Sequence, residues 1–155
     1  MTIFISYSLG IYEQYILNLL SKKLAERGHS LITNTYQGFD SQIQAQIQSA
    51  GLFLGLITVS GPPSKTSWVV HELNVAEGLG KPCLMLVQEG TRIQLSPKVL
   101  ESTIIFNPNN IDAAIRMVQE KSDQAQAQQS ANNAAWLLGG IAAIALLAYL
   151  SDDKK

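Results

Sequence analysis

Residues 52–59 (LFLGLITV) are a mainly apolar run of eight. A strand with one solvated face alternates apolar and polar residues, whereas a strand covered on both faces is almost continuously apolar. The length and composition of this run therefore predict a central strand of a parallel sheet. The segments before and after it indicate the rest of the sheet and the helices that cover it.

Four further apolar runs have the length of strands, and helix-like segments separate them. The predicted strands are 3–5, 29–33, 82–87 and 102–106, and the predicted helices are 12–27, 41–49, 66–80 and 111–121. In the first helix, Ile16, Leu19 and Leu20 recur at helical spacing, and Gly28 ends the pattern. Strands that alternate with helices favour right-handed crossovers and helices on both faces of the sheet. The expected fold is α/β, a flavodoxin-like, doubly wound parallel sheet of five strands.

The composition restricts the number of domains and the class of partner. The chain has 155 residues, enough for one domain of ordinary size and an appendage. Its formal net charge is −1 and 15% of its residues are charged, so it lacks the basic field that sequence-independent nucleic-acid binding needs. Cys83 is the single cysteine, which excludes an intramolecular disulfide and a thiolate zinc site. We expect no nucleic-acid partner, no metal site and a reducing compartment.

The C-terminal part of the chain has a different composition. Residues 124–151 contain no Asp, Glu, Lys or Arg, and residues 134–150 have no strongly polar side chain. At about 1.5 Å per residue, a helix of these 17 residues extends roughly 25 Å, close to the ~30 Å core of a bilayer. Trp136 and Tyr149 lie near its ends, as interfacial aromatics do. We expect a transmembrane helix at 134–150, although a buried core helix or an Ala-rich interface helix fits the same residues.

This interpretation divides the chain into four parts. Residues 1–121 form the α/β domain, 122–133 a Gln/Ala-rich linker, 134–150 the transmembrane helix and 151–155 a short polar tail. Because Gln and Ala are good helix formers, the linker can instead continue the last helix of the domain. No signal peptide is visible. The expected location is the membrane, through a single-pass C-terminal anchor, with the α/β domain in the cytoplasm.

Small residues recur at every fourth position in and just before the apolar segment, at Ala131, Ala135, Gly139 and Ala143. Such a stripe lets helix backbones approach closely in a membrane. We therefore expect the apolar helix to self-associate, although an Ala-rich sequence produces this spacing by chance equally well.

Segments that follow strands are where a doubly wound sheet is expected to place its site, because ligands bind at the carboxyl ends of the strands. None of these segments contains GxGxxG or GxxxxGK[ST]. Without either phosphate-binding pattern, the sequence argues against a nicotinamide-dependent redox enzyme and against a nucleoside triphosphatase.

Three other motifs stand in a distinctive order along residues 1–121. They are IFISYS at 3–8, QSAG at 48–51 and SKTSWVVHEL at 64–73. Together they resemble the Toll/interleukin-1 receptor (TIR) domain family. The most specific part of the resemblance is the Ser-Trp-x-x-x-Glu-Leu pattern at 67–73 on the third predicted helix.

The resemblance implies an activity, because TIR domains of the enzymatic branch cleave the nicotinamide N-glycosidic bond of NAD with a glutamate on the third helix. Glu72 matches that glutamate, and Trp68, one helical turn earlier, matches an aromatic residue that lines the nicotinamide side of the pocket. NAD is then a substrate, with no cofactor, and the product is ADP-ribose or a cyclic isomer. The family also implies a role in immune or antiphage signalling.

The same resemblance suggests which residues bind the substrate. Besides Trp68, they are Ser67, Tyr7, Ser8, Asn34 and Phe39. Asn34 stands where several members of the family have an acid, and Ser8 and Leu9 stand where some have arginines. We therefore expect pyrophosphate binding to rely on backbone N–H groups and hydroxyls, while ordinary turn chemistry explains the loop residues equally well.

Two other functions fit the same motifs. A non-enzymatic TIR adaptor would assemble through contacts between TIR domains and would not need Trp68 and Glu72. An effector that perturbs the membrane would use TIR clustering to bring the apolar helices together. The expected partners are accordingly NAD, the membrane and further copies of the chain, through the TIR domain and the apolar helix.

Overall fold

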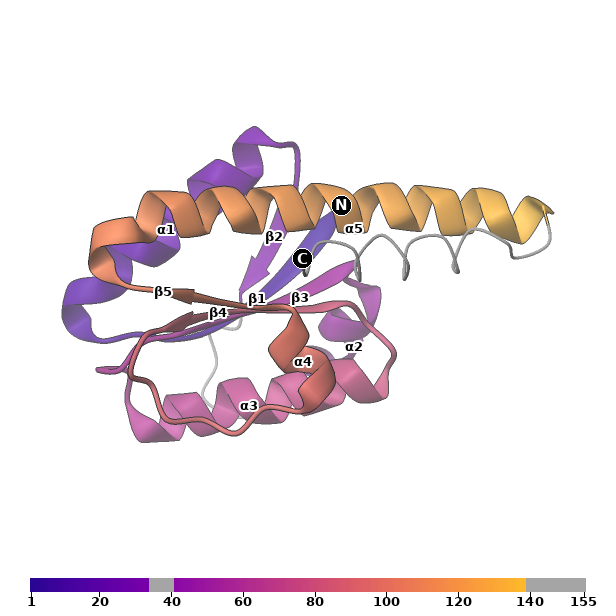
Figure 1. The fold of residues 1–155 in the computed structure, drawn as a ribbon. Helices are drawn as coiled ribbons and strands as arrows, with labels where there is room; N and C mark the ends of the chain where they lie inside the picture. The colour runs from indigo at the N-terminus through magenta and orange to yellow at the C-terminus, as the bar shows by residue number, and fades with distance from the viewer. Residues whose placement is uncertain (34–40, 139–155) are drawn as a thin grey trace.

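A five-stranded parallel sheet forms the centre of the protein (Figure 1), whose computed structural model describes residues 1–33 and 41–138. The strands are β1 (Thr2–Ser8), β2 (Ser30–Thr33), β3 (Leu52–Ile57), β4 (Cys83–Gln88) and β5 (Thr103–Phe106). Their order in the sheet is β2-β1-β3-β4-β5, and every neighbouring pair is parallel. All six residues of β3 are buried. The predicted flavodoxin-like α/β sheet with a buried central strand is confirmed, although this strand ends at Ile57 instead of residue 59.

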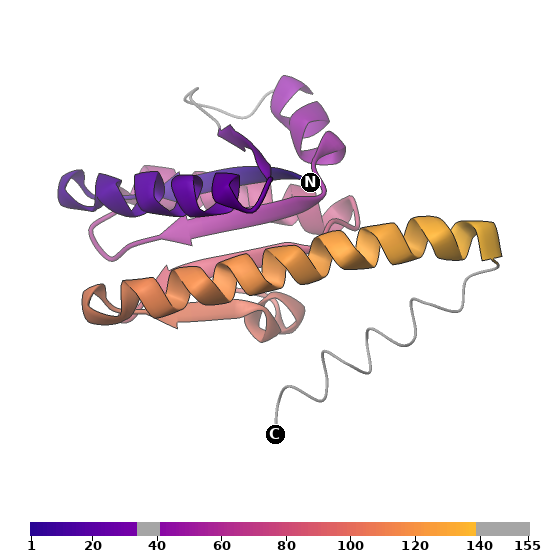
Figure 2. The same cartoon turned by 90° about the horizontal axis from the view of Figure 1, so that it is seen from above.

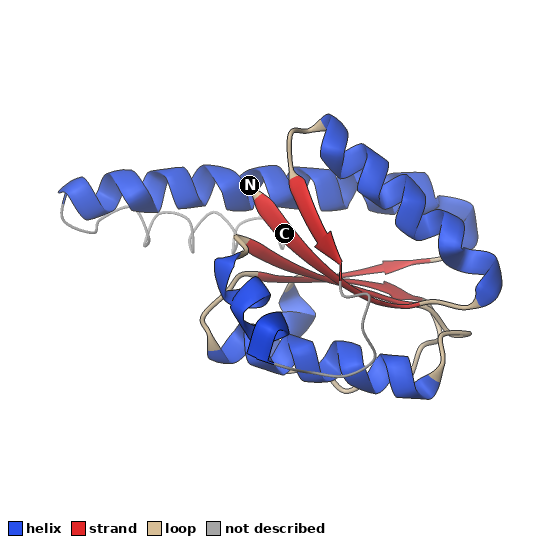
Figure 3. Ribbon diagram, turned by 180° about the vertical axis from the view of Figure 1, so that it is seen from behind, coloured by secondary structure: helices blue, strands red, loops and turns tan. Residues whose placement is uncertain are grey.

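Helices cover both faces of the sheet (Figures 1 and 3). Their bounds are α1 (Gln14–Glu26), α2 (Ser41–Ser49), α3 (Pro63–Gly78), α4 (Pro97–Glu101) and α5 (Ile111–Leu138), with short 3-10 turns η1 (Ile11–Glu13) and η2 (Pro108–Asn110). The buried side chains of α1 and α5 share one apolar cluster, and those of α2, α3 and α4 share another on the opposite face. Each face of the sheet therefore has its own core.

The two-residue period of β1 assigns its side chains to these cores. Ile3 and Ile5 belong to the cluster beneath α1 and α5, whereas Phe4 stacks on Phe53 of β3 in the cluster beneath α2 and α3, with ring centroids 5.9 Å apart. Continuing the alternation, Ser6 and Ser8 point to the α3 side. Both are buried, so the C-terminal half of β1 presents two hydroxyls to α3.

Two differences from the predicted elements have local causes. α3 begins at Pro63 instead of residue 66. Proline suits the first turn of a helix, because an N–H group there would have no acceptor within the helix. α4 was not predicted, yet the sequence carries its start signal: the Ser96 side chain accepts a hydrogen bond from the Val99 N–H, and Pro97 follows the cap. A helix of five residues is too short to show an apolar period.

α5 continues well past residue 121, through the segment that composition suggests as a linker. Its far part runs beyond the edge of the sheet (Figure 2). The Gln119 amide donates to the Lys23 carbonyl over 3.0 Å, and the Gln129 amide donates to the Gly51 carbonyl over 3.0 Å. Of the two alternatives for residues 122–133, the structure shows the continuous helix, and its first part packs on the domain.

Within residues 1–33 and 41–138, no helix is long and apolar enough to cross a membrane. This finding contradicts the expected location as a single-pass membrane protein. The physical reason is that α5, the helix leading into the apolar segment, carries charged, Gln and Asn residues as far as Asn133. Most of the expected transmembrane segment (139–150), the tail 151–155, and Gly139 and Ala143 of the small-residue stripe lie outside the described residues.

Candidate active site

Glu72 is an acidic side chain on the buried face of α3. The other buried residues of this helix, Val69, Leu73 and Ala76, are apolar, and Glu72 is only 2% exposed. α3 packs mainly on β1 and β3, so this face is turned to the centre of the sheet. Taking a carboxylate out of water is costly unless it is paired or hydrogen-bonded, so proteins seldom bury one without a reason. A buried glutamate in a helix face that is otherwise apolar is therefore the strongest functional candidate among the described residues.

The position of Glu72 along α3 places it away from the rim of the sheet. It lies nine residues after Pro63, the first residue of the helix. At about 1.5 Å per residue, that is roughly 13 Å along the helix axis from the carboxyl edge of the sheet, where α3 begins. Its carboxyl group thus lies along the face of the sheet, deeper than the crevice at the carboxyl ends of the strands.

Trp68 lies one turn before Glu72, at the surface of α3. It is 37% exposed. Its ring meets the ring of exposed His71 edge to face, with centroids 5.8 Å apart and an interplanar angle of 89°. The same helix therefore carries a buried carboxylate and, on the turn nearer the rim, a partly exposed aromatic plane.

Ser8 lies on the α3 side of the sheet and joins two segments. Its hydroxyl donates to the Pro62 carbonyl over 3.2 Å and lies 2.8 Å from the Thr66 hydroxyl. A side chain on Gly61 would collide with Ser8, so the glycine allows the end of β1 to approach the start of α3. Ser8 is completely buried, and its hydroxyl is committed to this junction.

The other substrate-binding candidates lie elsewhere. Tyr7 packs against the α1–α5 core, on the face of the sheet opposite to α3. Ser67 is exposed on α3, and its hydroxyl donates to the Pro63 carbonyl one turn back, over 3.1 Å. Asn34 and Phe39 lie outside the described residues. Of the seven candidates, four lie on the α3 side of the sheet: Glu72, Trp68, Ser67 and Ser8.

A second carboxylate, which is not among the predicted site residues, lies at the carboxyl edge of the sheet. Glu13 accepts hydrogen bonds from the Gly10 N–H (2.6 Å), the Thr58 hydroxyl (3.1 Å) and the Ser60 hydroxyl. These groups follow β1 and β3, the two strands between which the direction of winding changes. The signal in the sequence was a glutamate three residues after the residue that caps η1, the spacing of a capping box.

Cys83 is unsuited to nucleophilic chemistry. Burial, aided by the negative charge of Glu77, raises the pKa of its thiol to about 12, although Lys98 acts in the opposite direction. Its sulfur donates to the Lys81 carbonyl over 3.3 Å. At neutral pH the Cys83 thiol is therefore protonated and neutral.

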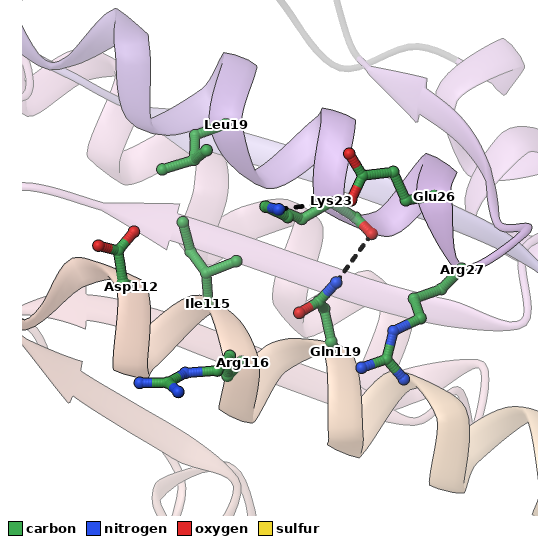
Figure 4. Close-up of a pocket in the computed structure, with 8 residues that line it drawn as sticks. All are labelled: Leu19, Lys23, Glu26, Arg27, Asp112, Ile115, Arg116 and Gln119. Carbon is green, nitrogen blue, oxygen red and sulfur yellow. Dashed lines mark hydrogen bonds and ion pairs between the residues drawn. The ribbon is translucent and has the colours of Figure 1, made fainter.

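A hollow lies on the other side of the sheet from Glu72. It is a groove of about 460 Å³ between α1 and α5, on the opposite face of the sheet (Figure 4). Leu19 and Ile115 supply apolar surface, and the rest of the lining is polar or charged: Lys23, Glu26, Arg27, Asp112, Arg116 and Gln119. Among the described residues, no group of three or more His, Cys, Asp or Glu could hold a metal ion.

Comparisons with known proteins support the fold and leave the chemistry open. No family model matches the sequence, and no curated protein does. The CMP N-glycosidase BcmB of Clostridium botulinum is similar in structure, with a TM-score of 0.51 and 19% identity, over 79% of this chain and 99% of that one. The TIR domain heterodimer of RPS4 and RRS1 is similar with a TM-score of 0.52 and 13% identity, over 79% and 97%. The chain therefore has a TIR-like fold.

Proposed function

We propose that this protein is an N-glycoside hydrolase that cleaves the nicotinamide–ribose bond of NAD, with Glu72 as its catalytic residue. The observation that carries the proposal is the burial of Glu72, which is 2% exposed on the sheet-facing side of α3. Trp68 supports it, because a partly exposed ring one turn away can stack against a planar base.

The chemistry explains why a buried carboxylate suits this reaction. When the bond between the ribose carbon and the nicotinamide nitrogen breaks, nicotinamide leaves as a neutral molecule with the bonding electrons, and positive charge remains on the sugar. A fixed carboxylate stabilises that oxocarbenium-like state, and more strongly in a site from which water is excluded. Water then adds to the ribose carbon and loses a proton, which gives ADP-ribose; attack by a nucleophile of the ADP-ribosyl group itself gives a cyclic isomer.

Two findings favour N-glycoside cleavage on this fold. One of the similar structures is that of a CMP N-glycosidase, and another is a pair of TIR domains. The pattern Ser67-Trp68-x-x-x-Glu72-Leu73 favours NAD over a pyrimidine nucleotide as the substrate, since it is the part of the sequence that most resembles the NAD-cleaving TIR branch.

The test is the release of nicotinamide from NAD by the full chain, followed by chromatography. We expect Glu72→Gln, which keeps the shape and removes the charge, to lower the rate at least about a hundred-fold, because one transition-state contact in such a site contributes on that scale. Glu120→Gln, which removes the same charge from the exposed face of α5, is the matched control and should leave the rate unchanged.

Two outcomes would contradict parts of the proposal. Equal rates for Glu72→Gln and Glu120→Gln would remove Glu72 from the mechanism. Cleavage of CMP without cleavage of NAD would keep the reaction type and overturn the choice of substrate.

A second candidate function is assembly, and a separate observation favours it. Ile11 and Tyr12 are 88% and 92% exposed, and Tyr15 at the start of α1 is 50% exposed. Large apolar side chains grouped in this way are typical of protein contact surfaces. We infer that the chain associates with further TIR-like domains through this patch, as an adaptor would, whether or not it cleaves NAD.

A further inference from the structure

The contacts between α5 and the rest of the domain change in character after Val118. Up to that residue, the buried side chains of α5 are apolar and belong to the core beneath α1 and α5: Ile111, Ala114, Ile115 and Val118. Between residues 119 and 131 the buried side chains are polar, namely Gln119 and Ser122, and Ala125 adds a partly buried apolar contact. We call residues 119–131 the strap. Because most helices are stabilised by packing of an apolar face, the strap lacks the usual source of docking energy.

Polar contacts at the amino ends of the strands hold the strap in place. Asp123 pairs with Arg27 and lies 3.2 Å from Nε2 of His29, the residue before β2. The Gln129 amide donates to the carbonyl of Gly51, the residue before β3, over 3.0 Å. The side chains of Arg27 and Asp123 are 46% and 37% exposed, and an ion pair so open to water contributes little stability. These contacts therefore favour docking only weakly.

Two buried polar atoms in the same interface have no hydrogen-bond partner among the residues that the structure describes. They are Nδ1 of His29, whose side chain is fully buried, and the hydroxyl oxygen of Ser122, the residue before Asp123. A buried polar group without a partner costs at least as much free energy as an ordinary hydrogen bond contributes. Water would bond to both atoms if the strap moved away, so their burial opposes docking.

We propose that the strap docks on the domain and undocks from it as one unit, while the sheet and the first part of α5 stay folded. Weak polar contacts favour the docked position and two unpaired polar atoms oppose it, so the two positions are close in free energy. Undocking exposes the His29 ring and lets the C-terminal part of the chain move relative to the sheet. The strap is thus a conformational switch within α5, and this inference does not depend on NAD cleavage.

Hydrogen exchange of the full chain under native conditions, measured by mass spectrometry, tests the proposal. A helical segment as short as the strap is marginally stable in water, so undocking leaves its amides open to exchange. We expect the amides of residues 119–131 to exchange at least about ten-fold faster than those of residues 111–118, and to depend little on low denaturant concentrations because a local opening exposes little surface. Exchange of the strap only together with the strands of the sheet would overturn the proposal.

Two matched pairs of variants distinguish undocking from fraying of a helix end. Asp123→Ala should speed exchange of the strap at least about ten-fold, because Nε2 of His29 then also loses its partner. Glu120→Ala, on the exposed face of α5, should have little effect. Ser122→Ala removes the buried unpaired hydroxyl and should slow exchange at least about three-fold more than Ser130→Ala, the same change at an exposed position. Fraying depends on helix propensity and would affect both members of a pair alike, so equal effects within either pair would overturn the proposal.

The two histidines of the chain provide a second measurement, which detects undocking even where the undocked strap stays helical. Diethyl pyrocarbonate acylates accessible imidazole rings, and His71, exposed on α3, is the internal reference for the buried His29. We expect the rate at His29 relative to His71 to be at least about ten-fold higher in Asp123→Ala than in Glu120→Ala, since undocking uncovers the ring. Equal relative rates in these two variants would overturn the proposal.

Discussion

The two acidic side chains that bear on function differ in their surroundings. Glu72 lies among apolar neighbours on the inner face of α3, whereas Glu13 is half-buried at the rim and held by three donors. A carboxylate near a reacting bond can stabilise positive charge on a sugar, whereas the Glu13 carboxylate joins the loop after β1 to the loop after β3. We therefore propose catalysis for Glu72 alone and regard Glu13 as a link between two loops of the fold.

Cys83 allows a prediction about pH. Since burial and the Glu77 charge raise the pKa of its thiol to about 12, the folded protein holds almost no thiolate at pH 8, whereas an unfolded chain with the ordinary value of 9.0 holds about a tenth. We expect alkylation by iodoacetamide at pH 8 to be at least about a hundred-fold slower in the native protein than in denaturant. The native rate should rise with pH throughout the range from 9 to 12. A native rate equal to the unfolded rate would show that the thiol is not protected.

At the scale of elements, the junction between β1 and α3 positions the candidate site. Ser8 at the end of β1 donates to the Pro62 carbonyl and lies within hydrogen-bond distance of Thr66 in the first turn of α3. Because Glu72 and Trp68 project from the same helix, this junction determines how far along the sheet both side chains lie. An error at the junction would therefore move the whole site.

Gly61 and Gly78 provide a matched pair that tests this junction. A side chain at Gly61 would collide with the backbone of Ser8, so Gly61→Ala must push β1 and α3 apart and should destabilise the fold by about 1–3 kcal/mol. Gly78, the last residue of α3, has open space around it, so Gly78→Ala should stabilise by up to about 1 kcal/mol through helix propensity. Denaturant unfolding measures both. Midpoints that move in the same direction would contradict the close contact at Gly61.

At the scale of the whole molecule, α5 joins parts of the fold that are distant in sequence. Asp123 lies 3.2 Å from the buried His29 ring and also pairs with Arg27, and Gln129 reaches the Gly51 carbonyl before β3. Through these contacts, the part of α5 after residue 121 packs near the ends of α1, β2 and β3. The folded domain therefore includes more of α5 than composition suggests.

The exposed patch Ile11, Tyr12 and Tyr15 predicts assembly. We expect the full chain to self-associate with rising concentration in analytical ultracentrifugation, and Tyr12→Ser to weaken this association by removing the most exposed apolar ring of the patch. Leu100→Ser is the control, because Leu100 is 56% exposed on α4, on the opposite face of the sheet from α1. If Tyr12→Ser and Leu100→Ser behave alike, the patch is not the contact surface.

Local patterns were sufficient for the elements and their class. Residues 52–59 indicated the central strand because a strand buried on both faces carries apolar side chains at nearly every position. The alternation of strands with helices indicated the parallel sheet. Glu72 and Trp68 were identified from a motif within one helix, so their relation did not depend on distant contacts. The spacing of apolar residues in a strand or helix involves only residues that are close in the chain, so it can be read from the sequence.

Only the tertiary structure decided which segments meet. Tyr7 and Ser8 are adjacent in the chain, yet they face opposite cores because neighbouring residues of a strand point to opposite faces. The Glu13 carboxylate joins residues 10–13 to residues 58–60, and no local pattern indicates a contact over that separation. The continuation of α5 over residues 122–133 was one of two alternatives in the sequence. Its contacts at Asp123 and Gln129 are with segments far back in the chain, so only folding could select it.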